Sequence, residues 1–579
     1  MNANSLWRGP LAAAILLLTF SACSGDDDSK AADAGHLRYV PADSPYVIAM
    51  NERLDDEILE AFEPHVDEIL AGYRELLRNV VEAARADAED TDAAVMSEID
   101  DFSGAIDALA ALLSVDGMEQ AGIPLGARMI LYGNGLLPVL RIELSDPALF
   151  EQAIAHIEQE AGQPMLTAKL GETTYRYVGD DDARVLITTI DGYAVLTLAP
   201  STFDDEQLRR LLGLDLPAKS LATTDVLGTV AKQYGYTQHY IGYVDTIRLV
   251  DAVLEPTSDL DTALLAGTDF DPSIVSSECK AEIREMAGIA PRMVFGYDHV
   301  GLDAFSGGLV VELRSDLAKA LTGVSNVVPG LGKDEGGALS FGASVNVKAL
   351  RDFYAARLDA MEADPYECEY FAELQAGTAK GREILAQPIP PVVYGVRGFN
   401  AVLESLDGID IASGQPPENV DASFVLAMDD ASALVAMGMM FSPELAALNL
   451  QPDGKPVELA LPQVSAVAQE AYAAMVDTAL AVAVGDGAEQ RVARVLNAPS
   501  GSPSPVFALA MDAGEYYRLI AEGMVAAPQD GVDELTIETQ ETARRIMLKL
   551  ADIYDRMSVE VRFIEQGAEV RSRVTLKDL

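Results

Sequence analysis

Residues 187–195 read ITTIDGYAV, and this stretch decides how the chain is expected to fold. Apolar and β-branched residues flank Asp191-Gly192, a dipeptide typical of a two-residue turn between paired strands. Strands joined by so tight a turn are antiparallel. The last segment, residues 558–577, shows the same pattern around Gln566-Gly567. The sequence therefore predicts a sheet that is mainly antiparallel.

A recurring unit, a strand followed by an amphipathic helix, surrounds this hairpin. The strand at 139–144 leads into Ser145-Asp146-Pro147, a strong helix start, and a helix through Ile157. Further strands of this kind are expected at 309–313, 343–347, 424–428 and 506–511. Helices that cover one face of an antiparallel sheet give an α+β fold.

The order of elements also repeats along the chain. A strand at 193–197 precedes a helix at 205–212 and a strand at 240–245. In the C-terminal half, a strand at 479–484 precedes a helix at 488–496 and the strand at 506–511. We interpret this as an ancient duplication that produced two related lobes.

An N-terminal helical hairpin is expected at 54–116, after an opening strand at 46–50. Apolar residues recur at alternating steps of four and three from Phe62 to Val80, which is the period of a helical seam, and Pro64 suggests that a new helix begins there. A second seam runs from Ile99 to Leu113. We interpret the hairpin as a lid packed over the sheet; the alternative is a partner-binding arm.

These patterns divide the chain into five parts. They are a signal peptide at 1–22, an acidic flexible tether at 23–38, a first α+β lobe at 39–255, a junction at 256–290 and a second α+β lobe at 291–579.

The first residues predict the address of the protein. Arg8 precedes a short apolar run that ends in Ser21-Ala22-Cys23. This resembles the lipobox signals of bacterial lipoproteins, in which the cysteine is diacylated and becomes the mature N-terminus. Ser24 in the next position implies transfer to the outer membrane, and we expect the periplasmic side of that membrane. The alternative is an ordinary cleaved signal with a chance cysteine.

Residues 41–45, Pro-Ala-Asp-Ser-Pro, carry a second resemblance. Large uncharacterised lipoproteins of Gram-negative bacteria open their mature part with a similar segment followed by a strand. The resemblance implies a location and no activity, and it assigns no site residue.

Composition excludes some partners and predicts one covalent bond. The net charge of -51 over 579 residues repels phosphate backbones, so nucleic acid is not an expected partner. Besides Cys23 the chain has only Cys279 and Cys368, which an oxidising compartment would pair as a disulfide. Two separate buried thiols are the alternative.

The sequence contains no recognisable catalytic or metal motif. The five histidines are scattered, and none forms a metal pair at helical spacing. Gly332-Lys333 lacks the glycine spacing of a phosphate-binding loop, and Ser340 lacks the first glycine of a nucleophile elbow. We therefore expect no catalytic residues, no cofactor and no enzymatic role.

One local cluster stands out as a candidate ligand or partner surface. Four tyrosines and a histidine lie within ten residues: Tyr234, Tyr236, His239, Tyr240 and Tyr243. A tyrosine has an apolar body and a polar tip, which suits a ligand rim or an interface. The alternative is a strand edge whose tyrosines pack over a helix.

These observations support three hypotheses. The first is a lipid-anchored envelope protein, held at the membrane by its N-terminal lipid, that binds another envelope protein or supports envelope assembly. The second is a carrier or binder of a lipid or other apolar ligand. The third, an envelope hydrolase, is disfavoured by the absence of paired catalytic motifs.

Overall fold

The structure is a computed structural model, and it describes residues 35–88, 112–162, 164–333, 336–405, 420–442, 446–459, 470–502, 504–525 and 534–578. The signal peptide, Cys23 and most of the tether lie outside the described residues. So do residues 89–111, which hold most of the second seam of the expected helical hairpin.

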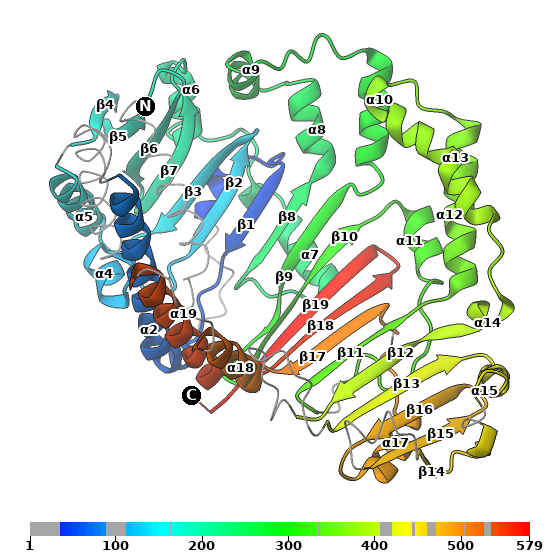
Figure 1. The fold of residues 1–579 in the computed structure, drawn as a ribbon. Coiled ribbons are helices and arrows are strands. Elements are labelled where there is room, and N and C mark those ends of the chain that lie inside the picture. The colour runs from blue at the N-terminus through cyan, green and yellow to red at the C-terminus, as the bar shows by residue number, and fades with distance from the viewer. Residues whose placement is uncertain are drawn as a thin grey trace.

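The described strands form one nineteen-stranded sheet, and every pairing in it is antiparallel. Across the sheet the strands follow the order β4 (Leu166–Leu170), β5 (Thr173–Gly179), β6 (Ala183–Ile190), β7 (Tyr193–Pro200), β3 (Leu137–Glu143), β2 (Met129–Asn134), β1 (Tyr46–Met50), β8 (Ile241–Asp245), β9 (Arg292–Val300), β10 (Ala304–Glu312), β19 (Gly567–Leu576), β18 (Tyr554–Ile564), β17 (Phe507–Asp512), β11 (Leu339–Ser344), β12 (Val396–Leu403), β13 (Ala422–Met428), β16 (Ala479–Val484), β15 (Ala471–Val476) and β14 (Val457–Glu458). Figure 1 shows them as one continuous curved band. The expected antiparallel α+β fold is confirmed.

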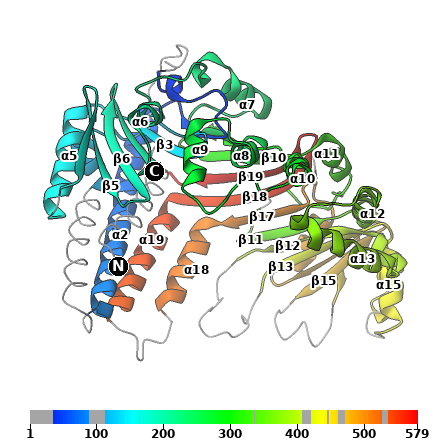
Figure 2. The ribbon, with the colours of Figure 1, turned by 90° about the horizontal axis from the view of Figure 1, so that it is seen from above.

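The helices gather in groups around this band (Figure 1). Those described are α2 (Asp56–Ala88), α4 (Val115–Gln120), α5 (Pro147–Glu160), α6 (Asp205–Leu212), α7 (Val226–Tyr234), α8 (Thr246–Leu254), α9 (Asp259–Ala266), α10 (Ser277–Ala287), α11 (Ser315–Leu321), α12 (Val347–Ala363), α13 (Ala372–Ala386), α14 (Pro391–Tyr394), α15 (Ala431–Met439), α17 (Ala488–Leu496), α18 (Ala513–Val525) and α19 (Glu534–Ile553), with 3-10 turns η2 (His36–Tyr39), η3 (Leu221–Thr223) and η4 (Glu369–Phe371). The views of Figures 1 and 2 agree that α2, α19 and α18 lie side by side.

Helices cover both faces of the sheet near β3, where we expected them on one. Val139 packs in a core with α6 and α7, while Leu140 and Ile142 pack in a second core with α4 and α5. Successive side chains of a strand point to opposite faces. A strand with apolar residues at successive positions, such as β3, therefore needs cover on both faces of the sheet. Strands farther along the chain that alternate apolar and polar residues need cover on one face only.

The opening helix α2 runs unbroken through Pro64, so the predicted division into two helices at this residue is wrong. Proline removes one backbone hydrogen bond from a helix interior. The buried side chains Ile58, Phe62 and Leu70 lie on both sides of Pro64 along the helix. Their packing against neighbouring elements favours a continuous helix despite the proline.

Two boundaries drawn from the sequence lie within paired or buried structure. Strand β9 pairs directly with β8, and the segment 256–290, which carries α9 and α10, connects these neighbouring strands. At the N-terminus, His36 is buried and its ring nitrogen lies 2.7 Å from the Asn51 side-chain oxygen. The last residues of the segment assigned to the tether, 36–38, thus belong to the 3-10 turn η2.

Cys279 and Cys368 are joined by a disulfide bond, the pairing expected from the sequence. Both residues are buried in a small core with Leu254 and Val275. Cys279 belongs to α10, and Cys368 precedes η4 between α12 and α13. The bond therefore fastens helices inserted between β8 and β9 to helices inserted between β11 and β12.

An arginine clamp closes the end of β3. Arg128 donates to both carboxylate oxygens of Glu143, at 3.0 and 2.7 Å, and Arg53 lies 3.0 Å from the same carboxylate. Burial alone would raise the pKa of Glu143, but the hydrogen bonds from Arg128 and Arg53 outweigh burial and lower that pKa to about 2.

We predict that Glu143→Gln lowers the free energy of unfolding by about 1–3 kcal/mol at neutral pH. Because the folded pKa lies below the unfolded one, the ion pair stabilises the fold fully above about pH 5, and this contribution disappears as the pH falls toward about 2. Denaturant unfolding of both proteins across this range measures the difference. The exposed Glu172→Gln serves as a control. A wild-type-to-variant difference that does not shrink on acidification would contradict the clamp.

Candidate functional site

A cavity of about 420 Å³ lies between helices α2 and α19 and one face of the sheet. Its walls are mainly apolar: Met50, Leu54, Phe62, Val66, Ile69, Leu70, Leu113, Gly126, Ala127, Val300, Phe305, Leu550 and Ile553, together with Tyr73, Tyr240, Tyr297 and Tyr554. The remaining lining residues are Glu52, His65 and His239. Ligand pockets in proteins commonly have this size and combine apolar walls with a few polar groups.

The floor of the cavity continues into a larger surface, which we call the apolar sheet face. Residues paired across neighbouring strands point to the same face. One register row runs through Tyr297, Gly307, Ser572, Val559, Leu509, Phe341, Ala401, Phe424 and Val482; a second through Val300, Phe305, Val574, Met557, Met511, Leu339, Leu403 and Ala422; a third through Phe295, Leu309, Val570, Val561, Phe507, Ala343, Phe399, Leu426 and Leu480. Tyr297 and Phe305 belong to both the cavity and this face.

Several large side chains of the apolar sheet face remain accessible. Phe341 is 43% exposed, Phe424 is 42% exposed and Phe507 is 39% exposed. Phe399 contacts Phe341 edge-on and stacks with Phe424, at ring-centre distances of 6.0 and 5.9 Å. A contiguous exposed apolar surface of this kind marks a binding region in a soluble protein.

On the central strands β18 and β19 the opposite side of the sheet is polar. On β18, Ser558, Glu560 and Arg562 alternate with the apolar residues, and the Arg562 guanidinium pairs with the Glu560 carboxylate. On β19, Arg571 pairs with Asp298 of β9. These two strands are therefore amphipathic, and only one of their faces suits an apolar ligand.

A buried hydrogen-bond relay holds the polar end of the cavity. The His36 ring meets the Asn51 side chain, whose amide donates to the Gln238 side-chain oxygen at 2.8 Å. The backbone N–H groups of Asn51 and Glu52 both donate to the Gln238 carbonyl, at 2.9 and 3.1 Å. This relay fixes Glu52 beside His239 at the cavity wall.

Glu52 and His239 are close without being hydrogen-bonded. The His239 Nδ1 atom lies 3.6 Å from a Glu52 carboxylate oxygen, beyond hydrogen-bond range, and it has no hydrogen-bond partner among the described residues. Burial lowers the pKa of His239, and the nearby carboxylates of Glu52 and Asp55 only partly oppose this effect. Burial therefore favours the neutral imidazole of His239, whose Nδ1 atom is buried without a partner among the described residues.

The structure divides the tyrosine cluster between the two faces of the sheet. His239 and Tyr240 line the cavity, and the Tyr240 ring contacts the rings of Phe295 and Tyr297. Tyr236 and Tyr243 are buried in the core on the other face.

The hydroxyl groups of the other three tyrosines differ in their hydrogen bonds. Tyr243 donates to the Ser44 carbonyl at 3.2 Å, and Tyr234 donates to the Glu312 carboxylate at 2.6 Å. The Tyr236 hydroxyl is buried without a partner in the described chain, and burial raises its pKa to about 12. The predicted surface thus contributes two residues to the cavity, while the alternative of core packing describes Tyr236 and Tyr243.

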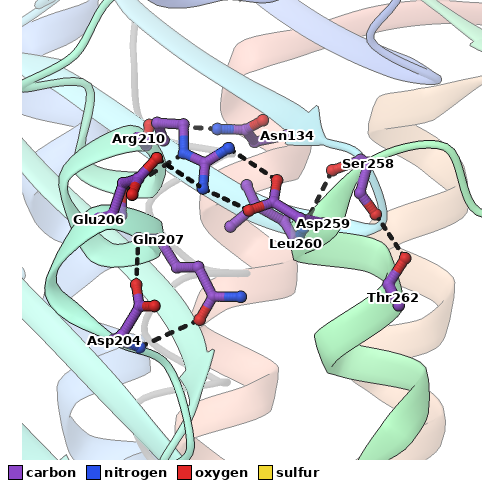
Figure 3. A network of polar contacts seen from close by, with 9 residues as sticks. All are labelled: Asn134, Asp204, Glu206, Gln207, Arg210, Ser258, Asp259, Leu260 and Thr262. Atoms are coloured by element: carbon purple, nitrogen blue, oxygen red, sulfur yellow. Dashed lines mark hydrogen bonds and ion pairs between the residues drawn. The ribbon is translucent and has the colours of Figure 1, made fainter.

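A second and larger cleft, of about 760 Å³, lies beside α6, α8 and α9. Figure 3 shows the network at its edge: Arg210 of α6 donates to Asp259 of α9 at 2.7 Å, and Asn134 donates to the Arg210 carbonyl at 3.3 Å. Both helices begin at polar caps, since Asp204 bonds the Gln207 N–H of α6 and Ser258 bonds the Leu260 N–H of α9.

Charged side chains that line this larger cleft pair with other groups of the protein. Arg284 pairs with Asp251 and Glu255 at 2.6 and 2.7 Å, and Arg248 donates to the Ser44 carbonyl at 3.1 Å. Asp261 is buried, which raises its pKa, and it accepts the Leu136 N–H at 2.7 Å. These contacts join helices to the sheet, so we assign the cleft a structural role.

The described part of the chain lacks two other kinds of site. No group of His, Cys, Asp or Glu there is arranged to hold a metal ion. Within the same residues, no helix combines the length and hydropathy needed to cross a membrane.

No protein-family model, curated protein or solved structure matches the chain. The functional assignment consequently depends on the geometry of the cavity and of the apolar sheet face.

Sequence reasoning missed most of the cavity. Phe62 and Val66 were recognised only as members of a helical seam, and Glu52 and Phe305 were not singled out, because these residues come from three separate segments that only the fold brings together. A usable signal did exist in residues 557–561, where Met, Val and Val alternate with Ser and Glu. That alternation indicates a strand with one apolar face.

We predict that Tyr236→Ala lowers the free energy of unfolding by about 3 kcal/mol or more, because it empties a core position. Tyr240→Ala should cost less, since its ring borders a cavity. Tyr236→Phe is the matched control and should be neutral or slightly stabilising, because the lost hydroxyl has no partner. Chemical denaturation of the three variants tests this order. A larger loss for Tyr240→Ala than for Tyr236→Ala would refute the assignment of faces.

Proposed function

We propose that the protein is a non-enzymatic binder of an apolar ligand such as a lipid, held between helices α2 and α19 and the apolar sheet face. The observation that carries this proposal is the continuity between the cavity and the exposed rows of the sheet, through Tyr297 and Phe305. Burying apolar surface is worth about 25 cal/mol per Å². An acyl chain laid from the cavity across the strands, along these rows, would gain this energy wherever it contacts the sheet.

A second candidate function is docking of another envelope protein. The observation that favours it is the end of α15, where Met440 is 81% exposed and Phe441 is 83% exposed. Exposed methionine and aromatic side chains are common at adaptable protein interfaces. A co-purifying protein in place of a co-purifying lipid would support this candidate over the first.

We further propose that Cys23 tethers the protein to the outer membrane, on its periplasmic side. The support is the lipobox-like segment that ends at Cys23, followed by Ser24. Two acyl chains give stable anchoring, whereas a single chain gives only marginal binding.

We predict that Cys23→Ser leaves the protein unprocessed or releases it from the membrane, because the acceptor of the lipid is lost. Metabolic labelling with a fatty-acid analogue, followed by membrane fractionation, measures the change. Cys279→Ser is the matched cysteine control and should retain the label. Labelling of the Cys23→Ser protein at the wild-type level would rule out this anchor.

We also propose that the fold consists of two related lobes with a helical insertion after the first strand of each. The support is the strand order. In the first lobe the neighbouring strands, in sheet order, are β6, β7, β3, β2, β1, β8, β9 and β10. In the second lobe they are β15, β16, β13, β12, β11, β17, β18 and β19, and each strand takes the place of its counterpart in the first lobe. Antiparallel pairing of β10 with β19 is what a twofold relation requires. Superposing the two sets should need a rotation near 180°, and a very different rotation would contradict the duplication.

We predict that the purified, natively extracted protein carries a bound apolar molecule, which mass spectrometry of a solvent extract detects. Val66→Trp should reduce the bound amount at least several-fold, because the larger side chain fills the cavity. Leu216→Trp, which enlarges an exposed side chain in the other cleft, is the matched control and should not. If Val66→Trp unfolds the protein, Ile69→Phe provides a smaller obstruction. Equal ligand content in the wild type and in a folded obstructed variant would overturn the proposed site.

A further inference from the structure

We infer that the ligand of this cavity is an amphiphile whose head group is uncharged or cationic and donates hydrogen bonds, and that Glu52 and His239 receive that head group. The inference rests on the proposed function and names the chemical class of its ligand. It excludes head groups that carry a carboxylate or a phosphate.

The charges at the cavity wall disfavour an anionic head group. Among the twenty residues that line the cavity there is one carboxylate, Glu52, and neither a lysine nor an arginine. Asp55 adds a second carboxylate within electrostatic range of His239. An anionic head group would thus meet like charge without a counter-ion, a situation that specific binding sites avoid.

Basic residues that adjoin cavity-lining residues in the sequence are already engaged. Arg53 pairs with Glu143 at 3.0 Å, and Lys549 pairs with Glu68. Arg74 donates to the carbonyl of Leu113, at 2.5 Å. None of these cations lines the cavity, and recruiting one would break its present contact.

The hydrogen-bonding groups of Glu52 and His239 suit a head group that donates hydrogen bonds. The Glu52 carboxylate accepts hydrogen bonds, and its oxygen lies 3.6 Å from the unpartnered His239 Nδ1 atom. A hydroxyl or ammonium group seated beside these two atoms could bond to both, whereas the two side chains do not bond to each other. Glu52 is about half exposed, so it sits at the mouth, while the apolar walls lie deeper. The polar end and the apolar body of an amphiphile match this arrangement.

The test compares three probes with the same twelve-carbon chain: dodecylamine, dodecanol and dodecanoate. Each displaces a fluorescent apolar dye from the delipidated full-length protein at about pH 8, where exposed imidazoles are neutral. We expect the amine and the alcohol to bind about tenfold or more tightly than the carboxylate. Equal or tighter binding of dodecanoate would overturn the inference while leaving the proposed function intact. Failure of all three probes to bind would overturn both.

Glu52→Gln isolates the charge. It should reduce the preference for the amine over the carboxylate to about threefold or less and leave the affinity for the alcohol nearly unchanged. Glu57→Gln, at an exposed position of α2 outside the cavity wall, is the matched control and should retain the full preference. An unchanged preference in the Glu52→Gln protein would show that Glu52 does not select the head group.

Discussion

The ladder between β10 and β19 is the contact on which the rest of the structure depends. Nine residue pairs join Ala304–Glu312 to residues 567–575, which are more than 250 positions away in the chain. We call this ladder the β10–β19 seam. Every strand on one side of it comes before residue 313, and every strand on the other side comes after residue 338. Without these pairs the sheet would end as two exposed edges, which are costly and prone to aggregation. The seam also brings Ile553 and Tyr554 next to Val300 and Phe305, so the cavity exists only when the seam has formed.

The seam also decides which face of the central sheet is apolar. On β19 the arginines Arg571 and Arg573 lie on one face, while Val570 and Val574 lie on the other. Antiparallel register transmits this alternation from strand to strand, because a slip of one residue would invert every side chain. The apolar rows therefore extend from β9 to β13, although the first row also contains Gly307 and Ser572. Helices α2, α18 and α19 cover only part of them, since the Tyr517 hydroxyl of α18 lies 3.7 Å from the Met557 sulfur. The accessible remainder is what gives the cavity a continuation.

Local features of this fold were predictable from the sequence, and long-range ones were not. The turn at Asp191-Gly192 forms as expected, with φ of 50° and 83°, because these two residues adopt the left-handed region that such hairpins need. Asp146 caps α5 as expected, because its side chain reaches the Ala148 N–H at 2.8 Å. The division at Pro64 failed because tertiary packing outweighed a local helix-breaking signal. The tyrosine cluster was assigned to one surface, yet the change of face along a strand places Tyr240 and Tyr243 on opposite sides of the sheet.

The two cavities differ in whether the polar side chains in their walls are already paired within the protein. In the larger cleft, guanidinium and carboxylate groups such as Arg210 and Asp259 bind each other, so a ligand would have to break contacts that hold α6 and α9 together. In the smaller cavity the walls are mainly apolar, and removing apolar surface from water is favourable in itself. Among the polar lining residues, His239 and Glu52 are held near each other by the relay through Asn51 and Gln238 without satisfying each other. A buried polar atom that lacks a partner is costly, and a ligand that supplies the partner recovers that cost on binding. The apolar walls would then supply most of the affinity, while this pair of residues would decide which ligands are accepted.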